Sequence, residues 1–241
     1  MNLEKRTALV TGGAVRLGRA LAIALARSGV NVAVHHHLPN NQIDATLQEL
    51  ASYGVRAEGF QADLSQADVP ARLFEAAQSA FGHIDFLINN AGIFPAGGWR
   101  DTTVEDWDEV FAVNLRAPFF LSQAFAQALG SSRGHIINIV DWRAVRPGIG
   151  HLAYTYAKAG LVAMTYSLAK AMAPHVQVNA IAPGAVLPPP GEGDSYLEAV
   201  TQQVPLKRHG TPEDVADAML YLLRSDFVSG EVLYVTGGQE L

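Results

Sequence analysis

One short segment near the N-terminus restricts the fold more than any other part of the chain. Residues 7–10 form an apolar run typical of a buried strand, and the sequence TGGAVRLG follows directly. A helical pattern then extends from Leu17 to Ser28 and ends at Gly29. A strand, a glycine-rich turn and a helix in immediate succession are the context of a dinucleotide-binding unit, because the free N–H groups of the helix N-terminus then face a pyrophosphate.

Several residues of this turn suit contact with a nucleotide. Gly12 and Gly13 allow a tight turn, and Gly18 lets the helix pack closely on the sheet. Arg16 occupies a position where such motifs often carry glycine, and an arginine there can hold a phosphate or reach toward a substrate. An ordinary glycine-rich turn is the alternative, but the strand before it and the helix after it favour nucleotide binding.

The rest of the chain repeats the alternation of strands and helices. Strand-like runs cover residues 31–35, 55–60, 84–88, 136–140, 175–181 and 231–235, and helical patterns cover 41–53, 69–81, 102–129, a stretch through 154–158 and a stretch opening at 211–214. This order predicts one α/β domain over residues 1–241, with a doubly wound parallel sheet of about seven strands and helices on both faces. Consecutive prolines at 188–190 cannot continue a helix or pair in a sheet, so residues 185–205 are predicted to form a substrate flap.

Composition excludes several classes of protein. A net charge of −6 without a basic cluster argues against nucleic acid as a partner. Cysteine is absent, which excludes disulfides, thiolate metal sites and cysteine nucleophiles. The first residues lead directly into a strand, and no apolar run approaches the roughly 20 residues that a membrane span needs. We therefore expect a soluble, cytoplasmic protein without a membrane partner.

The residues after the second strand bear on the choice of cofactor. Three histidines, His35 to His37, end this strand, and no Asp or Glu follows them. An acidic residue there selects NAD, whereas its absence admits a 2′-phosphate. Adjacent histidines of a strand point to opposite faces, so no metal site is expected. Asp63, just beyond the third strand, is either an acceptor for the adenine amino group or, like Ser65, a helix N-cap.

The sequence NNAG at 89–92 and the residues near it suit a flat ring. Small residues after a central strand let such a ring approach the backbone. Phe94 is either a lid over the ring or a core residue. Asn114 lies inside the helical pattern 102–129, where asparagine is unfavourable, so it marks either a kink with a bound water or a satisfied core amide.

The segment 134–158 carries the candidate catalytic groups. Asp141 follows an apolar, β-branched strand, and ligands gather at the carboxyl ends of the strands in open α/β sheets. Tyr154 and Lys158 are four residues apart, so they share one helix face, whereas Tyr156 points away. An ammonium near a phenol lowers its pKa, which makes Tyr154 a candidate for proton transfer. A surface lysine beside an amphipathic tyrosine is the alternative.

These motifs together resemble the short-chain dehydrogenase/reductase family over the whole chain. The resemblance rests on TGGAVRLG, NNAG, Asn114, Tyr154-x-x-x-Lys158 and Pro183-Gly184, in this order. It implies a one-domain Rossmann fold, a nicotinamide cofactor and an Asn–Ser–Tyr–Lys tetrad. Asn114, Tyr154 and Lys158 match this tetrad, but Asp141 stands in place of the serine, thirteen residues before Tyr154.

That departure points to one branch of the family, the pteridine reductases, which the chain also resembles in Arg16, the three histidines, QADLS and Phe94. In this branch an aspartate replaces the serine, a phenylalanine stacks the pterin against the nicotinamide, and an arginine touches cofactor phosphate and pterin. The branch implies NADPH as the cofactor and a homotetramer. Leu38 stands where its members often have an arginine for the 2′-phosphate.

The resemblance assigns residues to each part of the site. The catalytic residues are Asp141, Tyr154, Lys158 and Asn114. The cofactor is expected against Gly12, Arg16, Leu17, Gly18, His36, His37, Asp63, Leu64, Asn90, Ala91, Gly92, Tyr154, Lys158, Pro183, Gly184 and Val186. A pterin-like substrate is expected against Arg16, Phe94, Asp141, Tyr154 and Leu187.

Electrostatics give Asp141 an independent interpretation. An ionised carboxylate only accepts hydrogen bonds and repels the negative charge that develops on a ketone oxygen during reduction. A pterin C=N bond instead gains an N–H, and a carboxylate holds the ring's amino groups. A loop aspartate that caps a turn is the alternative. Three functions stay open: a pteridine reductase, a carbonyl reductase of 3-oxoacyl thioesters or small ketones, and a weakly active NADP-binding sensor.

The assembly is predicted from the helices that carry Asn114 and Tyr154. Both are apolar on more than one face, as at Ala157, Leu161, Val162 and Met164. One face is expected to pack on the sheet and the other on a partner. The family resemblance implies that the assembly is a tetramer of D2 symmetry.

Overall fold

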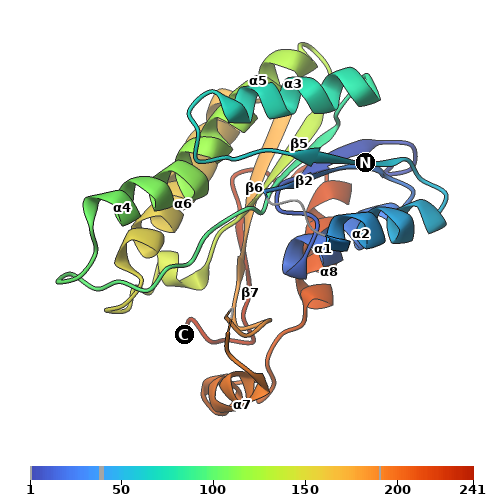
Figure 1. Ribbon diagram of the computed structural model, residues 1–241. Coiled ribbons are helices and arrows are strands. Elements are labelled where there is room, and N and C mark those ends of the chain that lie inside the picture. Colours follow the sequence, from blue (N-terminus) through green and yellow to red (C-terminus); the bar gives the residue numbers. More distant parts are fainter. Residues whose placement is uncertain (1, 38–40, 190) are drawn as a thin grey trace.

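A parallel seven-stranded sheet forms the centre of the part of the chain that the computed structural model describes, which is residues 2–37, 41–189 and 191–241 (Figure 1). Leu38 and Asn40 lie outside these residues. The strands are β1 (Thr7–Val10), β2 (Asn31–His36), β3 (Ala57–Gln61), β4 (Phe86–Asn89), β5 (Gly134–Ile139), β6 (Val176–Pro183) and β7 (Val232–Val235). They lie in the order β3-β2-β1-β4-β5-β6-β7, and every neighbouring pair is parallel. The predicted fold class is confirmed.

Two layers of helices cover the sheet (Figure 1). One layer holds α1 (Arg16–Arg27), α2 (Asn41–Ser52) and α8 (Pro212–Arg224), and the other holds α3 (Val69–Phe81), α5 (Ala117–Leu129) and α6 (Leu152–Ala171). A hydrophobic core lies between the sheet and each helix layer, and successive strand residues point into the two cores alternately. Val10 packs in the core beneath α1, α2 and α8, and Leu9 packs in the core beneath α3, α5 and α6. This alternation explains why the central strands carry apolar residues on both faces.

The chain order creates a crevice at the centre of the sheet. From β1 the chain moves outward through β2 and β3, then returns to β4 on the other side of β1. Ligands bind at such a switch point, outside the carboxyl ends of the strands. The turns after β1 and β4 therefore meet there.

The helical pattern predicted over 102–129 is interrupted. It consists of α4 (Val104–Phe111), a π-helical turn (Ala112–Arg116) and α5. Asn114 lies in the π-helical turn, is fully buried, and bonds to the backbone of Ile93 in both directions. The amide of Asn114 is therefore satisfied within the core, and the helix is also interrupted at this residue, so features of both interpretations are present. π-Helical turns inside helices often mark functional sites.

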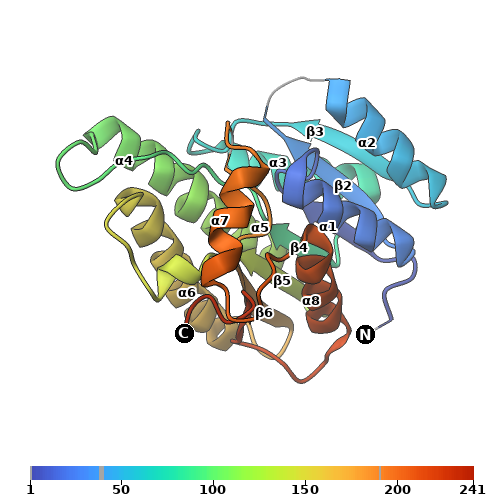
Figure 2. The same ribbon diagram turned by 90° about the horizontal axis from the view of Figure 1, so that it is seen from below.

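The segment 185–205, predicted to form a substrate flap, contains α7 (Asp194–Gln203), which lies apart from the two helix layers in Figure 1 and crosses the centre of the view in Figure 2. One expectation about assembly needs correction. The four α6 residues cited for apolar character on more than one face are all buried within the chain, so none of them is available to a partner: Ala157, Leu161, Val162 and Met164. Exposed aromatic side chains on α4, α5 and α6 are Trp107, Phe119, Phe120, Tyr156 and Tyr166.

The observed ends of some strands and helices differ by a few residues from the predicted ends, because pairing with a neighbouring strand sets where a strand begins. For example, β3 begins at Ala57 rather than Val55, because Ala57 is the first residue that pairs with β2. No helix in the described residues is both long enough and apolar enough to cross a membrane.

Candidate active site

A cavity of about 570 Å³ lies at the carboxyl ends of the strands. Every site residue predicted from the sequence lines it, with one exception. That exception is Asn114, whose side chain is fully buried beneath the loop after β4. The cavity therefore gathers residues from the ends of β1, β2, β3, β4, β5 and β6.

The glycine-rich turn packs on itself at one end of this cavity. Gly12 has a φ of +62°, in the left-handed region that favours glycine. A Cβ at Gly18 would lie 2.0 Å from the carbonyl oxygen of Gly12, so Gly18 allows α1 to pack on the turn rather than on the sheet. Among the described residues, no side chain caps the N-terminus of α1, where Val15 is the N-cap. The N–H groups of this terminus fit a phosphate.

Arg16 begins α1 and reaches the flap. Its backbone has a φ of +51°, and its guanidinium donates a hydrogen bond to the carbonyl of Pro188. Both Arg16 and the neighbouring flap residue Leu187 line the cavity. The arginine thus connects the glycine-rich turn to the segment predicted to cover the substrate.

His35 is a structural element of the site that the sequence analysis did not identify. The N–H of Gly12 donates to its Nδ1 (3.0 Å), and its Nε2 lies 3.1 Å from the carbonyl oxygen of Ala62, so Nε2 carries the proton. Burial lowers the pKa of His35 to about 4. The neutral ring therefore ties the glycine-rich turn to the end of β3. Its signal in the sequence was a histidine inside a buried strand, which needs partners for both nitrogens.

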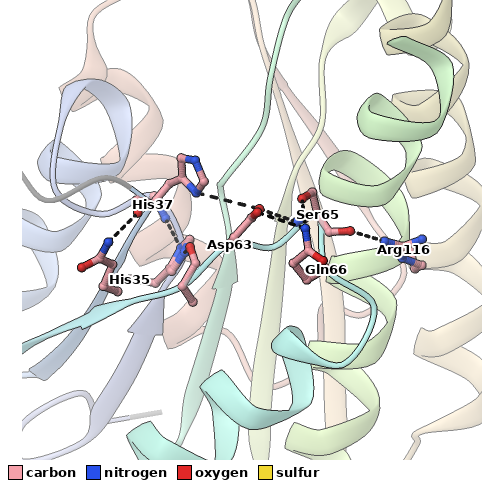
Figure 3. Close-up of polar contacts among 9 residues, drawn as sticks. His35, His37, Asp63, Ser65, Gln66 and Arg116 are labelled. Carbon is pink, nitrogen blue, oxygen red and sulfur yellow. Dashed lines mark hydrogen bonds and ion pairs between the residues drawn. The ribbon is translucent and has the colours of Figure 1, made fainter. Parts of the chain in front are cut away.

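Asp63 lies against the third histidine (Figure 3). Its carboxylate is 3.9 Å from Nδ1 of His37 and accepts a hydrogen bond from the N–H of Ser65 at 2.9 Å. Hydrogen bonds from Ser65 hold the pKa of Asp63 below its usual value. The helix α3 begins only at Val69, so Asp63 caps a turn and not a helix. Arg116, at the end of the π-helical turn, donates to the carbonyl of Ser65.

Asp141 and Tyr154 form the polar centre of the cavity. The phenol of Tyr154 donates to Oδ2 of Asp141 at 2.9 Å, while Oδ1 accepts from the N–H of Arg143 at 2.8 Å. The guanidinium of Arg143 also lies 3.4 Å from Oδ2. Asp141 therefore fits both interpretations, because one carboxylate oxygen caps the turn and the other faces Tyr154.

Lys158 does not act on Tyr154 as the sequence analysis predicted. Its ammonium donates to the carbonyl of Ile139 at 2.7 Å and lies 5.7 Å from the centre of the Tyr154 ring. Burial lowers the pKa of Lys158 to about 8. Burial, followed by the charge of Asp141, raises the pKa of Tyr154 well above its usual value. The predicted lowering of this pKa is wrong, because the phenol is buried and is in contact with the carboxylate rather than with the ammonium.

Phe94 is partly buried at the edge of the cavity, and its ring meets the ring of Tyr154 edge to face, with centroids 4.6 Å apart at 80°. The preceding residue, Ile93, is held by Asn114 through two hydrogen bonds of 3.0 Å. Asn114, predicted from the sequence to be catalytic, thus fixes the backbone next to Phe94.

Comparisons with known proteins agree with this geometry. The family model described as Enoyl-(Acyl carrier protein) reductase matches residues 13–240. The chain is 34% identical to the (2S)-[(R)-hydroxy(phenyl)methyl]succinyl-CoA dehydrogenase subunit BbsD of Thauera aromatica, over 100% of this chain and 99% of that protein. It is 34% identical to the 3-oxoacyl-[acyl-carrier-protein] reductase FabG of Aquifex aeolicus, over 99% and 98%. The crystal structure of the FolM alternative dihydrofolate reductase 1 of Brucella canis, complexed with NADP, is similar with a TM-score of 0.94 and 31% identity, over 99% of this chain and 95% of that one.

Proposed function

Because the chain belongs to the short-chain dehydrogenase/reductase family, we propose that it is an NADPH-dependent reductase of pterin, dihydropterin or dihydrofolate rings. The catalytic residues would be Asp141, Tyr154, Lys158 and Asn114. The similarity to a FolM alternative dihydrofolate reductase complexed with NADP supports both the cofactor and the substrate class.

The cavity fits a dinucleotide of this kind. The uncapped N-terminus of α1 and the guanidinium of Arg16 would hold the pyrophosphate, and His36 and His37 would face the 2′-phosphate. Small residues at 90–92 leave room for a flat ring between the turn after β4 and Tyr154. When bound, NADPH supplies a hydride for an unsaturated carbon of the substrate.

The observation that carries the proposal is the hydrogen bond between Tyr154 and Asp141. A ketone reductase needs a donor at this position to stabilise an oxyanion, and an ionised carboxylate opposes that charge. Reduction of a C=N bond adds a proton to nitrogen, and a carboxylate beside a phenol suits this step. Asp141 would accept hydrogen bonds from ring amino groups and orient the substrate.

Proton transfer falls to Tyr154. Burial beside Asp141 raises its pKa, so the phenol keeps its proton until a stronger acceptor arrives. Transfer of that proton to a ring nitrogen would leave a phenolate, and the ammonium of Lys158, which lies 5.7 Å from the centre of the ring without contacting the phenol, would favour this negative charge only at a distance. Asn114 would act indirectly, by fixing the loop that carries Phe94.

A carbonyl reductase is the second candidate. The similarity to FabG and to BbsD, both named for thioester substrates, favours it. In that case Asp141 would be a replacement of the family's serine that has no role in pterin binding. A homotetrameric assembly and a cytoplasmic location are further proposals, taken from the family resemblance.

An assay of NADPH oxidation separates the two functions. The purified protein is supplied in turn with dihydrobiopterin, dihydrofolate and an acetoacetyl thioester. We expect turnover with at least one of the first two and little with the third. Turnover of the thioester alone would overturn the pterin proposal and establish the carbonyl reductase.

A further inference from the structure

The side chain of His151 is directed away from the helix that it begins. His151 is the N-cap of α6, the helix of Tyr154 and Lys158, but it makes no capping hydrogen bond. Its backbone is left-handed, with φ +53° and ψ +44°, a conformation uncommon for residues other than glycine. Ser, Thr, Asp or Asn is preferred at an N-cap, because such a side chain satisfies a free N–H. The side chain of His151 therefore does not serve to cap the helix.

The imidazole is fixed to the loop after β4 at two points. It stacks on the ring of Phe94, with centroids 3.8 Å apart and planes 10° from parallel. Its Nδ1 lies 2.7 Å from the carbonyl oxygen of Pro95. Because a carbonyl only accepts, Nδ1 carries the proton and donates it.

Phe94 is therefore held from both sides. Asn114 binds the N–H and the carbonyl of Ile93, just before Phe94, and His151 binds the carbonyl of Pro95, just after it. The N–H of Leu152 adds a fourth bond, to the carbonyl of Gly97 at 3.0 Å. Phe94 lines the cavity and His151 does not, so the imidazole supports the phenyl ring from outside the cavity lining. The guanidinium of Arg143 also lies 5.7 Å from the centre of the Phe94 ring.

We propose that His151 is a positioning residue for the substrate: it holds the Phe94 ring in place so that a planar heteroaromatic ring packs on the side facing the cavity. The inference rests on the proposed function and adds to it a residue outside the cavity. A flexible acyl chain would gain little from a rigid phenyl platform, whereas a flat ring gains stacking area only if the platform is fixed.

Two substitutions test the role of the imidazole. His151→Asn tolerates the left-handed backbone but removes the ring, and His151→Tyr keeps an aromatic ring without the bond from Nδ1. We expect His151→Asn to raise the KM for dihydrobiopterin about tenfold, as for the loss of one stacked aromatic pair, with kcat little changed. His151→Tyr should recover most of this loss. His175 is an exposed histidine beyond the end of α6. The variant His175→Asn is the matched control and should behave like the unmodified protein.

A double-substitution cycle shows whether His151 acts through Phe94. In a Phe94→Leu background, His151→Asn should cause no further rise in KM, since the platform is already gone. The Tm and the NADPH affinity of each variant are measured as controls for misfolding. Neither quantity should change much for His151→Tyr, so a change in KM can be assigned to the substrate site.

The outcomes are distinct. An unchanged KM in His151→Asn, or additive effects in the cycle, would overturn the positioning role while pterin reduction stands. Absence of pterin turnover in the unmodified protein would overturn the proposed function, and the positioning role with it.

Discussion

The imidazole of His37 lies 3.9 Å from the carboxylate of Asp63, although the two residues follow different strands. The chain has no acidic residue directly after β2, and this absence was the argument for NADPH. The fold brings a carboxylate to the same place from the turn after β3 (Figure 3). Cofactor choice therefore depends on the balance between an exposed histidine and a nearby aspartate.

Substitution of His37 by Asp is expected to invert or abolish the preference for NADPH over NADH. A second carboxylate would repel the 2′-phosphate, and the loss of a hydrogen bond to a charged group lowers affinity about 10- to 100-fold. Fluorescence titration with both cofactors measures this. Asp63→Asn is the opposite variant and should raise the affinity for NADPH. Equal affinity of the unmodified protein for the two cofactors would contradict the prediction.

Asp141→Ser distinguishes the two candidate activities by the sign of its effect. Pterin turnover should fall by roughly 10²- to 10⁴-fold, the range for loss of a proton-transfer partner. Reduction of a 3-oxoacyl thioester should rise, because a hydroxyl donor replaces a repelling charge. NADPH affinity should hardly change and serves as the control. Intact pterin reduction with a rise in thioester reduction would favour the carbonyl reductase.

Stability is expected to fall as the solution is acidified from about pH 6.5 to pH 4. Burial lowers the folded-state pKa of His35 and that of His135 to about 4, below the ordinary histidine value of 6.5. The unfolded chain therefore binds more protons in this window, which favours unfolding by at most about 3 kcal/mol per histidine. Above the unfolded pKa this loss is absent, and below pH 4 it is complete.

The variant His35→Gln checks the assignment of that window. Glutamine has both a donor and an acceptor but does not titrate. The difference in Tm between pH 7 and pH 4.5 should be smaller in this variant than in the unmodified protein. An identical difference would show that His35 does not contribute.

Gly92→Ala should disturb the site from within. A Cβ there would lie 2.6 Å from Oδ1 of Asn114, which is buried and already bonded to Ile93. Overpacking of this kind costs about 1–3 kcal/mol, so we expect a Tm several degrees lower and a loss of turnover. Gly148→Ala, where a Cβ meets nothing within 4 Å, is the matched control. Full activity and unchanged Tm in Gly92→Ala would contradict the packing argument.

An exposed aromatic cluster on α4 and α6 is a candidate contact surface of the proposed tetramer, and a substitution in it tests the assembly. Trp107 of α4 stacks on Phe111 and lies 5.9 Å from the ring of Tyr156 of α6, and both Trp107 and Tyr156 remain partly exposed. Light scattering at micromolar concentration should give four chains for the unmodified protein. Trp107→Asp should give a smaller species, because a charge cannot be buried there without a partner. A monomeric unmodified protein would refute the tetramer.

Local patterns in the sequence were sufficient for the fold and for most of the cavity. Apolar runs of strand length alternate with helical periodicity, and strands connected by helices must pair in parallel, with their carboxyl ends at one edge. Residues that follow these strands, such as Gly12, Asn90 and Asp141, therefore meet at that edge in any such sheet. Their contribution to one cavity follows from chain order alone.

Only the tertiary structure decided how these groups act on each other. The pKa of Tyr154 rises because the phenol is buried, and because Asp141, and not Lys158, is in contact with it. Neither the carboxylate of Asp63 beside His37 nor the imidazole of His151 stacked on Phe94 has a signal in local sequence. Periodicity determines which face a side chain occupies, but distances of a few ångströms between residues far apart in the chain depend on how the elements pack.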